Sequence, residues 1–191
     1  DGEWEFYWQH LYTPEQFAAV NSIYTDQTFD VDADAGNLSG QLSLQYKFNP
    51  QYNVYATYSK SYKPIGINVG GLPVIEATEL AEVKPESVNH VEFGVKTSPS
   101  RTSFLNLTLY QTNIKDYQIQ VQTPDPGVNR GYLANAEKVR VQGVELDGSV
   151  RPWDFLRLNG ALAYTDGKYI SFTNAPVPLE EVGGAEAFKD V

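Results

Sequence analysis

The amino-acid sequence predicts an all-β fold, an antiparallel up-and-down transmembrane β-barrel segment, on three observations. Apolar and polar residues alternate with a period of two through several segments, as in strands that have one apolar and one polar face. Short turns alternate with long connections along the chain, as they do in outer-membrane barrels. Aromatic residues make up 13% of the chain and gather near the expected strand ends, where amphipathic rings prefer the membrane interfaces.

The first two expected strands are residues 36–48 and 52–62. In the first strand, Leu42 and Leu44 lie on one face, while serine, glutamine and lysine side chains lie on the other. Pro50 separates the two strands, because a proline cannot donate a hydrogen bond to a strand ladder. We therefore expect a short turn here.

A long connection is expected from Lys63 to Glu86, where glycine and proline are frequent. Strands at 88–97 and 102–121 follow, and a short turn at Pro99 joins them. This long connection therefore lies at the opposite strand ends from the turn at Pro99.

The last two expected strands are 132–150 and 155–165, with a short turn at Pro152. A turn cluster at Pro124 precedes them, and residues beyond 167 read as a loop. In total, roughly six or seven strands of a larger barrel are expected, with long extracellular loops and short periplasmic turns.

Within 132–150, the alternation changes phase. Val139 and Val141 are out of step with Val144 and Leu146. One extra residue in a strand reverses which face the following side chains occupy. We therefore expect a β-bulge near Gln142-Gly143.

Residues 1–35 are expected to form an extracellular loop region. Thr13-Pro14-Glu15 predicts the start of a short helix, because threonine caps helix ends and proline suits the first turn. The chain shows no signal peptide and no Met at position 1, so we expect a partial barrel from a longer protein.

Three acidic residues after the expected helix raise the question of a metal site. Asp30, Asp32 and Asp34 resemble the start of a calcium loop, but Gly36 comes one position late and no glutamate follows at the required spacing. The preferred interpretation is an acidic, solvated loop, with calcium binding as the weaker alternative and no cofactor expected.

Composition excludes several function classes. The formal net charge of −10 disfavours nucleic acid as a partner, because phosphate binding needs a basic face. Cysteine is absent, which removes disulfides and thiolate metal sites. No nucleophile elbow or phosphate loop is present, so we expect no enzyme.

Two carboxylates invite a catalytic interpretation that we reject. Glu145 and Asp147 share one strand face about 7 Å apart at strand rise, which glycosidase carboxylates also show. A strand that faces a polar lumen carries such pairs routinely, and Arg157 on the next strand is the expected partner. We therefore expect them to line the barrel interior.

Parity assigns the remaining wall residues to two faces. Leucines at 44, 107, 158 and 162 are expected on a convex outer face. The concave, lumen-facing wall is expected to carry His90, Glu92, Asn106, Thr108, Glu145, Asp147, Arg157 and Asn159.

Three stretches, in order, resemble TonB-dependent outer-membrane receptors. The first runs from Tyr58 to Asn68 and fits Tyr-x-x-x-Tyr-Lys-x-x-Gly-x-Asn. The second has Pro85-Glu86 followed by Glu92-Phe93-Gly94-Val95-Lys96, and the third has Asn135-Ala136 followed by Gly143-Val144-Glu145. The resemblance covers about residues 38 to 175.

The resemblance implies a barrel of roughly 22 strands filled by an N-terminal plug. The plug domain is absent from this sequence, so contact with the TonB complex would run through that missing part. The implied function is energised uptake of a scarce nutrient, with a ferric siderophore the first candidate, in the bacterial outer membrane and in contact with its lipid. The implied ligand contacts come from outer loops and the upper lumen: Tyr62, Lys63, Asn68 and Arg130.

Two other function classes remain as alternatives. A plug-free porin would need a constriction loop and ion-selective lumen charges. A soluble β-sandwich binding domain would need protein to cover both strand faces. Leu105, Leu107 and Leu109 distinguish these classes, because protein covers them in a sandwich and lipid covers them in a barrel.

Overall fold

The computed structural model describes residues 13, 15–16, 30–68, 81–122, 131–173, 175–176 and 188–189. Among them, no helix is long and apolar enough to cross a membrane. Glu15 and Gln16 are helical, and Thr13 and Gln16 cap each other. The Thr13 amide donates to Gln16 Oε1 (3.0 Å) and the Gln16 amide donates to Thr13 Oγ1 (3.3 Å), which confirms the predicted helix start.

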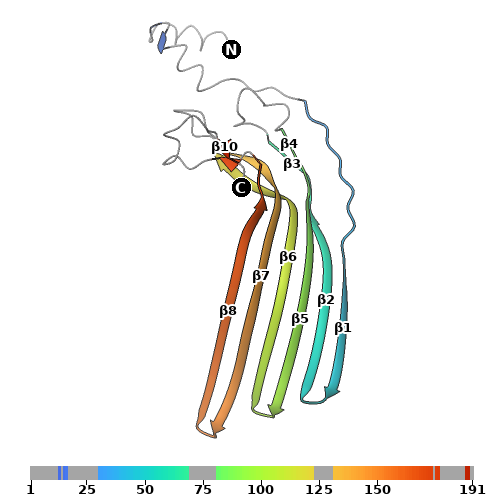
Figure 1. The fold of residues 1–191 in the computed structure, drawn as a ribbon, viewed down its shortest axis with the longest axis vertical. Coiled ribbons are helices and arrows are strands. Elements are labelled where there is room, and N and C mark those ends of the chain that lie inside the picture. The colour runs from blue at the N-terminus through green and yellow to red at the C-terminus, as the bar shows by residue number, and fades with distance from the viewer. Residues whose placement is uncertain are drawn as a thin grey trace.

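Six long strands form one antiparallel sheet with the order β1-β2-β5-β6-β7-β8 (Figure 1). Each long strand pairs with the next long strand in the chain, so the predicted up-and-down meander is confirmed. The strands are β1 (Gly40–Asn49), β2 (Tyr52–Lys63), β5 (Glu86–Ser100), β6 (Ser103–Gln122), β7 (Gly131–Trp153) and β8 (Leu156–Ser171). Two short pairs accompany them: β3 (Gly66–Ile67) with β4 (Glu82–Val83), and β9 (Ala175–Pro176) with β10 (Phe188–Lys189).

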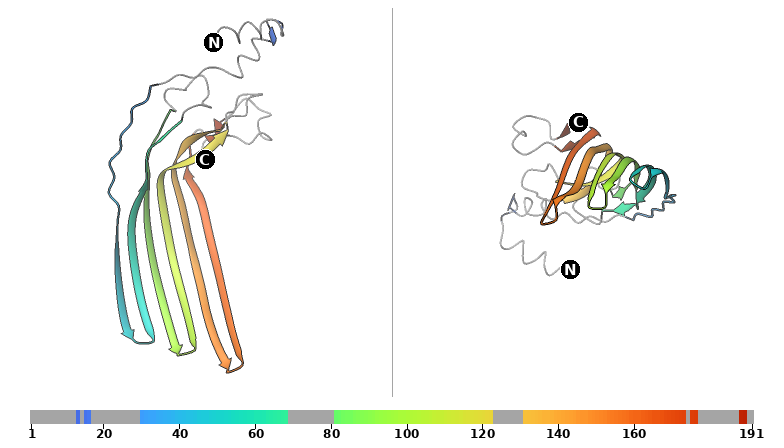
Figure 2. Two further views of the ribbon diagram at one scale, coloured as in Figure 1. Left: turned by 180° about the vertical axis from the view of Figure 1, so that it is seen from behind. Right: turned by 90° about the horizontal axis from the view of Figure 1, so that it is seen from below.

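Three tight turns lie together at one end of the sheet, and the β2–β5 and β6–β7 connections leave from the other end (Figure 1). This segregation confirms the predicted topology. Viewed along the strands, the sheet follows an arc and is not flat (Figure 2). The barrel is not closed, because these six strands supply only part of a wall.

The turns fall slightly later than the sequence predicted. Pro99 and Pro152 lie inside the last residues of β5 and β7, and the chain reverses at 101–102 and 154–155. The register shifts between Thr97 and Ser100 and again between Val150 and Trp153. Each proline therefore lies where the ladder is already interrupted, so its missing N–H breaks no regular bond. Similarly, β8 continues to Ser171, beyond the predicted end at 165.

The register places apolar and polar residues on opposite faces across all six strands. We call the face that carries Leu107 the outer face and the face that carries Thr108 the inner face. One outer row consists of Tyr46, Val54, Val95, Leu107, Leu146 and Leu162. The adjacent inner row consists of Gln45, Tyr55, Gly94, Thr108, Glu145 and Ala163.

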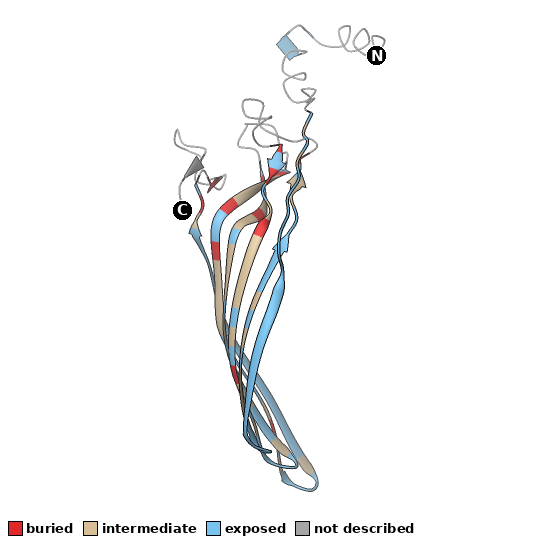
Figure 3. Cartoon of the chain, turned by 90° about the vertical axis from the view of Figure 1, so that its right-hand side faces the viewer, coloured by how far each residue is buried: buried red, intermediate tan, exposed pale blue. Residues whose placement is uncertain are grey.

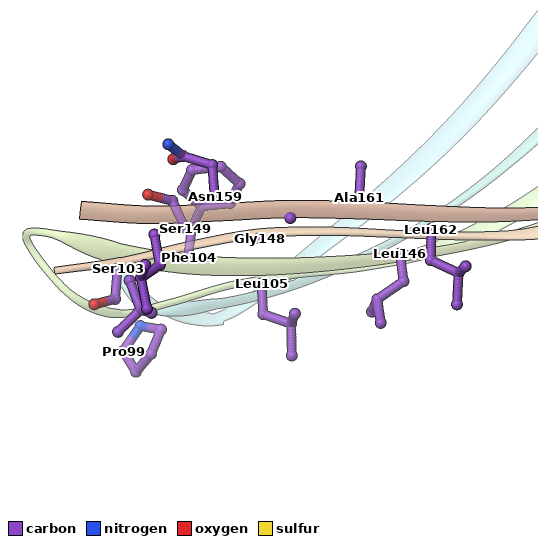
Figure 4. A pocket seen from close by; sticks show the side chains of 13 residues that line it. Pro99, Ser103, Phe104, Leu105, Leu146, Gly148, Ser149, Asn159, Ala161 and Leu162 are labelled. Carbon is purple, nitrogen blue, oxygen red and sulfur yellow. The ribbon is translucent and has the colours of Figure 1, made fainter. Parts of the chain in front are cut away.

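A close view of the turn end shows this separation directly. Leu105, Leu146 and Leu162 point to one side of the strands, while Asn159 and Ala161 point to the other (Figure 4). The leucines border a shallow depression at this end of the sheet, where Gly148 and Gly160 pair and contribute no side chain.

Along β6 the apolar side chains are more exposed than the polar ones, which is the reverse of the pattern in a water-soluble sheet. The side chains of Leu105, Leu107 and Leu109 are 50%, 37% and 42% exposed, whereas Thr108 and Tyr110 are half-buried. No described segment covers the outer leucines, and exposed colouring dominates the lower strands (Figure 3). A sheet with an uncovered apolar face and a more enclosed polar face suits lipid outside and a polar interior.

Beyond Leu109, toward the loop end, the outer face becomes polar and the inner face becomes apolar. On the outer face, the row after Leu109 contains Gln111, Gln142 and Asp166. On the inner face, Val139 and Val141 turn inward. The β6–β7 register runs without a shift from 104↔149 to 115↔138, so the bulge predicted near Gln142-Gly143 is wrong.

The out-of-phase valines have a tertiary cause. They join a small apolar core at the loop end of the sheet, where several of the buried positions in Figure 3 lie. Outside lipid, the ordinary rule of apolar inside and polar outside applies again. The buried members of this core are Ala81, Val121, Tyr132, Ala136, Val139, Phe172 and Ala175.

Candidate functional site

The β3–β4 pair brings the two ends of the long connection together at the loop end of the sheet. Gly66 and Ile67 pair with Val83 and Glu82, and the Asn68 amide donates to the Ala81 carbonyl (2.8 Å). A Cβ placed on Gly66 would meet Val83 at 3.4 Å and Leu133 at 3.8 Å, so this pair lies against β7.

Gln118 of β6 ties both ends of this connection to the wall. Its side-chain amide donates to the Pro64 carbonyl (2.8 Å) and to the Lys84 carbonyl (3.0 Å). The residue is 6% exposed. A buried amide with two such bonds holds its partners firmly, because losing it would leave buried carbonyls unpaired.

Asn135 of β7 repeats this arrangement beside Gln118. Its Oδ1 accepts from the Lys84 amide (2.9 Å), and its Nδ2 donates to the carbonyls of Lys84 (3.0 Å) and Asp116 (2.7 Å). Asp116 has a positive φ of 54°, which costs energy for a residue other than glycine. The Asn135 bond to its carbonyl supports that conformation.

Asn68 has a structural task that the sequence did not reveal. Its Oδ1 accepts from the Leu133 amide and its Nδ2 donates to the Leu133 carbonyl, each at 2.9 Å. The side chain thereby pairs with β7 as another strand residue would, and Asn68 is 6% exposed. The sequence named it as a ligand contact, but its amide is already engaged with Leu133.

Lys63 and Glu86 close the base of the same connection. Lys63 Nζ lies 3.5 Å from Glu86 Oε1, which also accepts a hydrogen bond from the backbone N–H of Gln118 (2.8 Å). Glu86 is buried, whereas the Lys63 side chain is 53% exposed. Tyr62 is 42% exposed and lies on the opposite face of β2 from Lys63, and Arg130 lies outside the described residues.

We call Asn68, Glu86, Gln118 and Asn135 the loop clamp. Its members come from four separate places in the chain and fasten one connection to β6 and β7. Sequence reasoning named Asn68 as a ligand contact, quoted Glu86 and Asn135 only as parts of motifs, and missed Gln118. The buried Gln118 gives no period-two signal of its own, because alternation describes faces and not contacts between distant segments.

The inner face below the clamp carries a polar network. Tyr55 Oη donates to Glu92 Oε1 (2.6 Å) and lies 3.3 Å from Thr108 Oγ1. His90 Nδ1 lies 2.8 Å from Thr112 Oγ1, and His90 Nε2 lies 3.5 Å from Glu92 Oε2. Hydroxyl, imidazole and carboxylate groups thus bond one another along neighbouring strands.

Glu145 and Asp147 lie on this inner face, but Arg157 does not pair with them. The register sets Ala163 opposite Glu145 and Ala161 opposite Asp147. Asp147 instead accepts from Asn106 Nδ2 (3.1 Å). The expected contact with Arg157 is wrong, because the tight turn places Arg157 farther toward the strand ends, below the Ser149↔Asn159 pair.

The acidic segment shows no metal site among the described residues, where no group of three or more potential ligands gathers. Glu137, near the loop end, has a different role. Burial raises the pKa of its carboxyl, but hydrogen bonds from Thr173 and Ser171 outweigh this, so its pKa lies below the usual value. The Thr173 amide donates to Glu137 Oε2 at 2.9 Å.

Comparisons with known proteins agree with this geometry. Residues 9–181 match the family model described as TonB dependent receptor-like, beta-barrel. The metal-pseudopaline receptor CntO of two Pseudomonas aeruginosa strains, UCBPP-PA14 and PAO1, is 32% identical over 130 residues, 67% of this chain. The chain spans 16% of those receptors' length.

Solved structures show the same fold. The copper transporter OprC matches with a TM-score of 0.57 and 18% identity, over 69% of this chain and 20% of that one. The ferric-catecholate import receptor Fiu of E. coli K12 matches with a TM-score of 0.52 and 21% identity, over 72% of this chain and 19% of that one. At these identities the likeness concerns the fold alone.

The family model covers most of the chain, and the six-stranded meander and its inverted faces have the form that such a wall requires. The family comprises receptors and transporters of the bacterial outer membrane and not enzymes. This chain therefore belongs to the TonB-dependent receptor family, as part of its β-barrel domain.

Proposed function

We propose that this chain forms part of the barrel wall of an outer-membrane receptor that imports a metal–chelate complex, with a ferric siderophore as the first candidate cargo. The observation that carries the proposal is the loop clamp, which fastens a long connection to the inner side of the wall at the loop end. A connection held in this way can present side chains to a ligand that enters from that end.

The exposed groups at the clamp have suitable chemistry for an anionic cargo. Lys63 offers an ammonium group at the clamp, and Tyr62, the preceding residue, offers a phenol on the other face of β2; both are exposed. Many metal chelates carry net negative charge, and such ligands are attracted by a cation at a loop base. We keep Tyr62 and Lys63 as proposed ligand contacts together with Arg130, and assign Asn68 to positioning of the connection.

The names of related proteins support this cargo class. The curated relative is a metal-pseudopaline receptor, and the structures of similar fold include a copper transporter and a ferric-catecholate import receptor. We propose that the energy comes from the TonB complex, acting through a plug that fills the barrel. The wall would then perform no chemistry.

The two alternatives make different demands on the structure. A porin has no need for a plug, and its ion selectivity would depend on Glu145 and Asp147. A soluble sandwich would cover Leu107, which no described segment does. We therefore favour the receptor.

The test uses the complete protein that contains this chain, produced in an iron-starved strain lacking its other receptors. Growth of this strain is scored on a ferric catecholate and a ferric hydroxamate, and growth on cobalamin is scored in a second strain that depends on cobalamin. Deleting residues 65–72 should abolish or weaken uptake, whereas Glu145→Gln with Asp147→Asn should leave it nearly intact. Barrel folding is checked by the heat-dependent mobility of the protein on gels.

Because the deletion removes Asn68 and could disturb the wall, Tyr62→Ala with Lys63→Ala serves as the milder variant. Uptake lost by the double amide variant and retained by both loop variants would contradict the proposal and favour the porin. Growth on cobalamin alone would keep the receptor and reject a ferric siderophore as the cargo.

A further inference from the structure

The outer face carries a group of cationic side chains to which neither the packing of the wall nor the proposed import function assigns a role. The register sets Arg140 of β7 directly opposite Lys168 of β8, and Lys115 of β6 directly opposite Lys138 of β7. We call Lys115, Lys138, Arg140 and Lys168 the cation cluster. The chain as a whole has a formal net charge of −10, so the cation cluster is a local positive patch on an acidic protein.

Like charges set directly opposite each other on neighbouring strands destabilise a sheet. Lys168 has partial relief, because its Nζ lies 3.1 Å from Asp166 Oδ2. In the described part of the chain, Lys115, Lys138 and Arg140 form no ion pair. Three of the four side chains are exposed and Arg140 is half-buried, so an external anion can reach them.

The position of the cation cluster along the strands, relative to the membrane, indicates which kind of anion it binds. On β7 the uninterrupted apolar outer run ends at Val144, the next outer residue is Gln142, and Arg140 lies four residues beyond Val144 toward the loop end. Four residues span about 13 Å along a strand, or roughly 10 Å in height at a tilt of about 45°. Lysine and arginine side chains extend several ångströms back toward the membrane, which brings their charges to the headgroup layer.

We propose that the cation cluster binds the phosphorylated headgroup of an anionic lipid in the outer leaflet. Arginine and lysine are the usual partners of phosphate, and arginine can hold two of its oxygens at once. Asn113, opposite Arg140, adds an amide to the same row. The cluster lies on the outer face of β6–β8, whose upper ends are seen in Figure 1, and so faces away from cargo in the lumen.

The experiment compares two double variants of the complete protein in non-ionic detergent. Lys138→Gln with Arg140→Gln removes two cluster charges, and Lys47→Gln with Lys96→Gln removes two charges from the inner face. The probe is lipid A with both phosphates, and binding is read from the shift in thermal unfolding. We expect the cluster variant to bind roughly thirtyfold more weakly, about fivefold for each charge removed, and the inner-face variant to bind as wild type does.

A second readout needs no lipid. Without lipid A, the cluster variant should unfold at a higher temperature than wild type, because two like-charge pairs are relieved. Equal binding by both variants, or an equal loss in both, would overturn the proposal. Dephosphorylated lipid A should bind no better to wild type than to the cluster variant. If millimolar inorganic phosphate stabilised wild type as well as lipid A does, the site would be one for small anions and the lipid assignment would be wrong.

Should the double variant fail to assemble, Lys138→Gln alone supplies the same test with a smaller expected loss, about fivefold. Lys47→Gln alone is its matched control.

Discussion

Tyr110 lies across Gly143 on the neighbouring strand, and its Oη reaches Thr165 Oγ1 on the strand beyond at 2.9 Å. The inner face repeats this arrangement one row below and two strands away, where Tyr55 crosses Gly94 to reach Thr108. In both places the glycine leaves room for the ring, and the hydroxyl connects three adjacent strands. The two glycines thus belong to the packing of the wall, in addition to the family motifs that contain them.

The first prediction concerns Gly143→Ala. A Cβ at this position would lie 2.6 Å from the Tyr110 ring and 2.6 Å from the Tyr164 carbonyl oxygen. The free energy of unfolding should fall by about 1–3 kcal/mol, the usual cost of overpacking. Gly160→Ala is the control, because nothing lies within 4 Å of its Cβ. Denaturant unfolding of the complete protein measures both, and equal stabilities would disprove the close approach of Tyr110.

The second prediction tests the two faces. Leu107→Arg places a charge on the outer face, where lipid would surround it, and should cost about 2–4 kcal/mol near the membrane midplane. Thr108→Arg places the same charge on the inner face and should cost much less. Unfolding in lipid vesicles gives the two free energies. If the costs were alike, the outer face could not be the lipid-facing one.

The third prediction concerns the loop clamp. Gln118→Ala removes the donor to the Pro64 and Lys84 carbonyls and should cost about 1–3 kcal/mol, because a buried group loses its partner. Amide hydrogen exchange should accelerate at β3 and β4 and stay unchanged in β1. Gln111→Ala, on the exposed outer face, is the matched control. Unaltered exchange at Val83 in the Gln118 variant would show that other contacts hold the connection.

The fourth prediction is a pH dependence at Glu137. Burial raises the pKa of its carboxyl, but the hydrogen bonds from Thr173 and Ser171 lower this pKa by more than burial raises it. The folded pKa therefore lies below the unfolded one. Such a group stabilises the fold fully above its unfolded pKa and loses that contribution as pH falls through its folded pKa.

Exchange protection of the Thr173 amide should therefore persist at mildly acidic pH and decline only at pH values below the usual glutamate range. In Glu137→Gln this acid-dependent step should disappear. A decline that is unchanged in the glutamine variant would assign the titration to another group.

The sequence by itself determined the strands and their two faces. Alternation of Leu105, Leu107 and Leu109 with polar residues is a local property, because successive side chains in a strand must point to opposite sides. The meander followed from short turns, which leave neighbouring strands no other partner. Even the helix cap at Thr13 could be predicted, since both capping partners lie within one turn.

Only the tertiary structure decided what lies at the loop end. The loop clamp joins residues 19 to 65 positions apart, such as Asn135 with Asp116 and Asn68 with Leu133, and no period reports such contacts. Val139 and Val141 looked like a bulge because the sequence does not show where lipid ends and the apolar core begins. Arg157 failed as a partner of Asp147 because register, set by the position of the turn, separates them. Local alternation fixes faces, whereas the meeting of distant segments depends on how the whole chain packs.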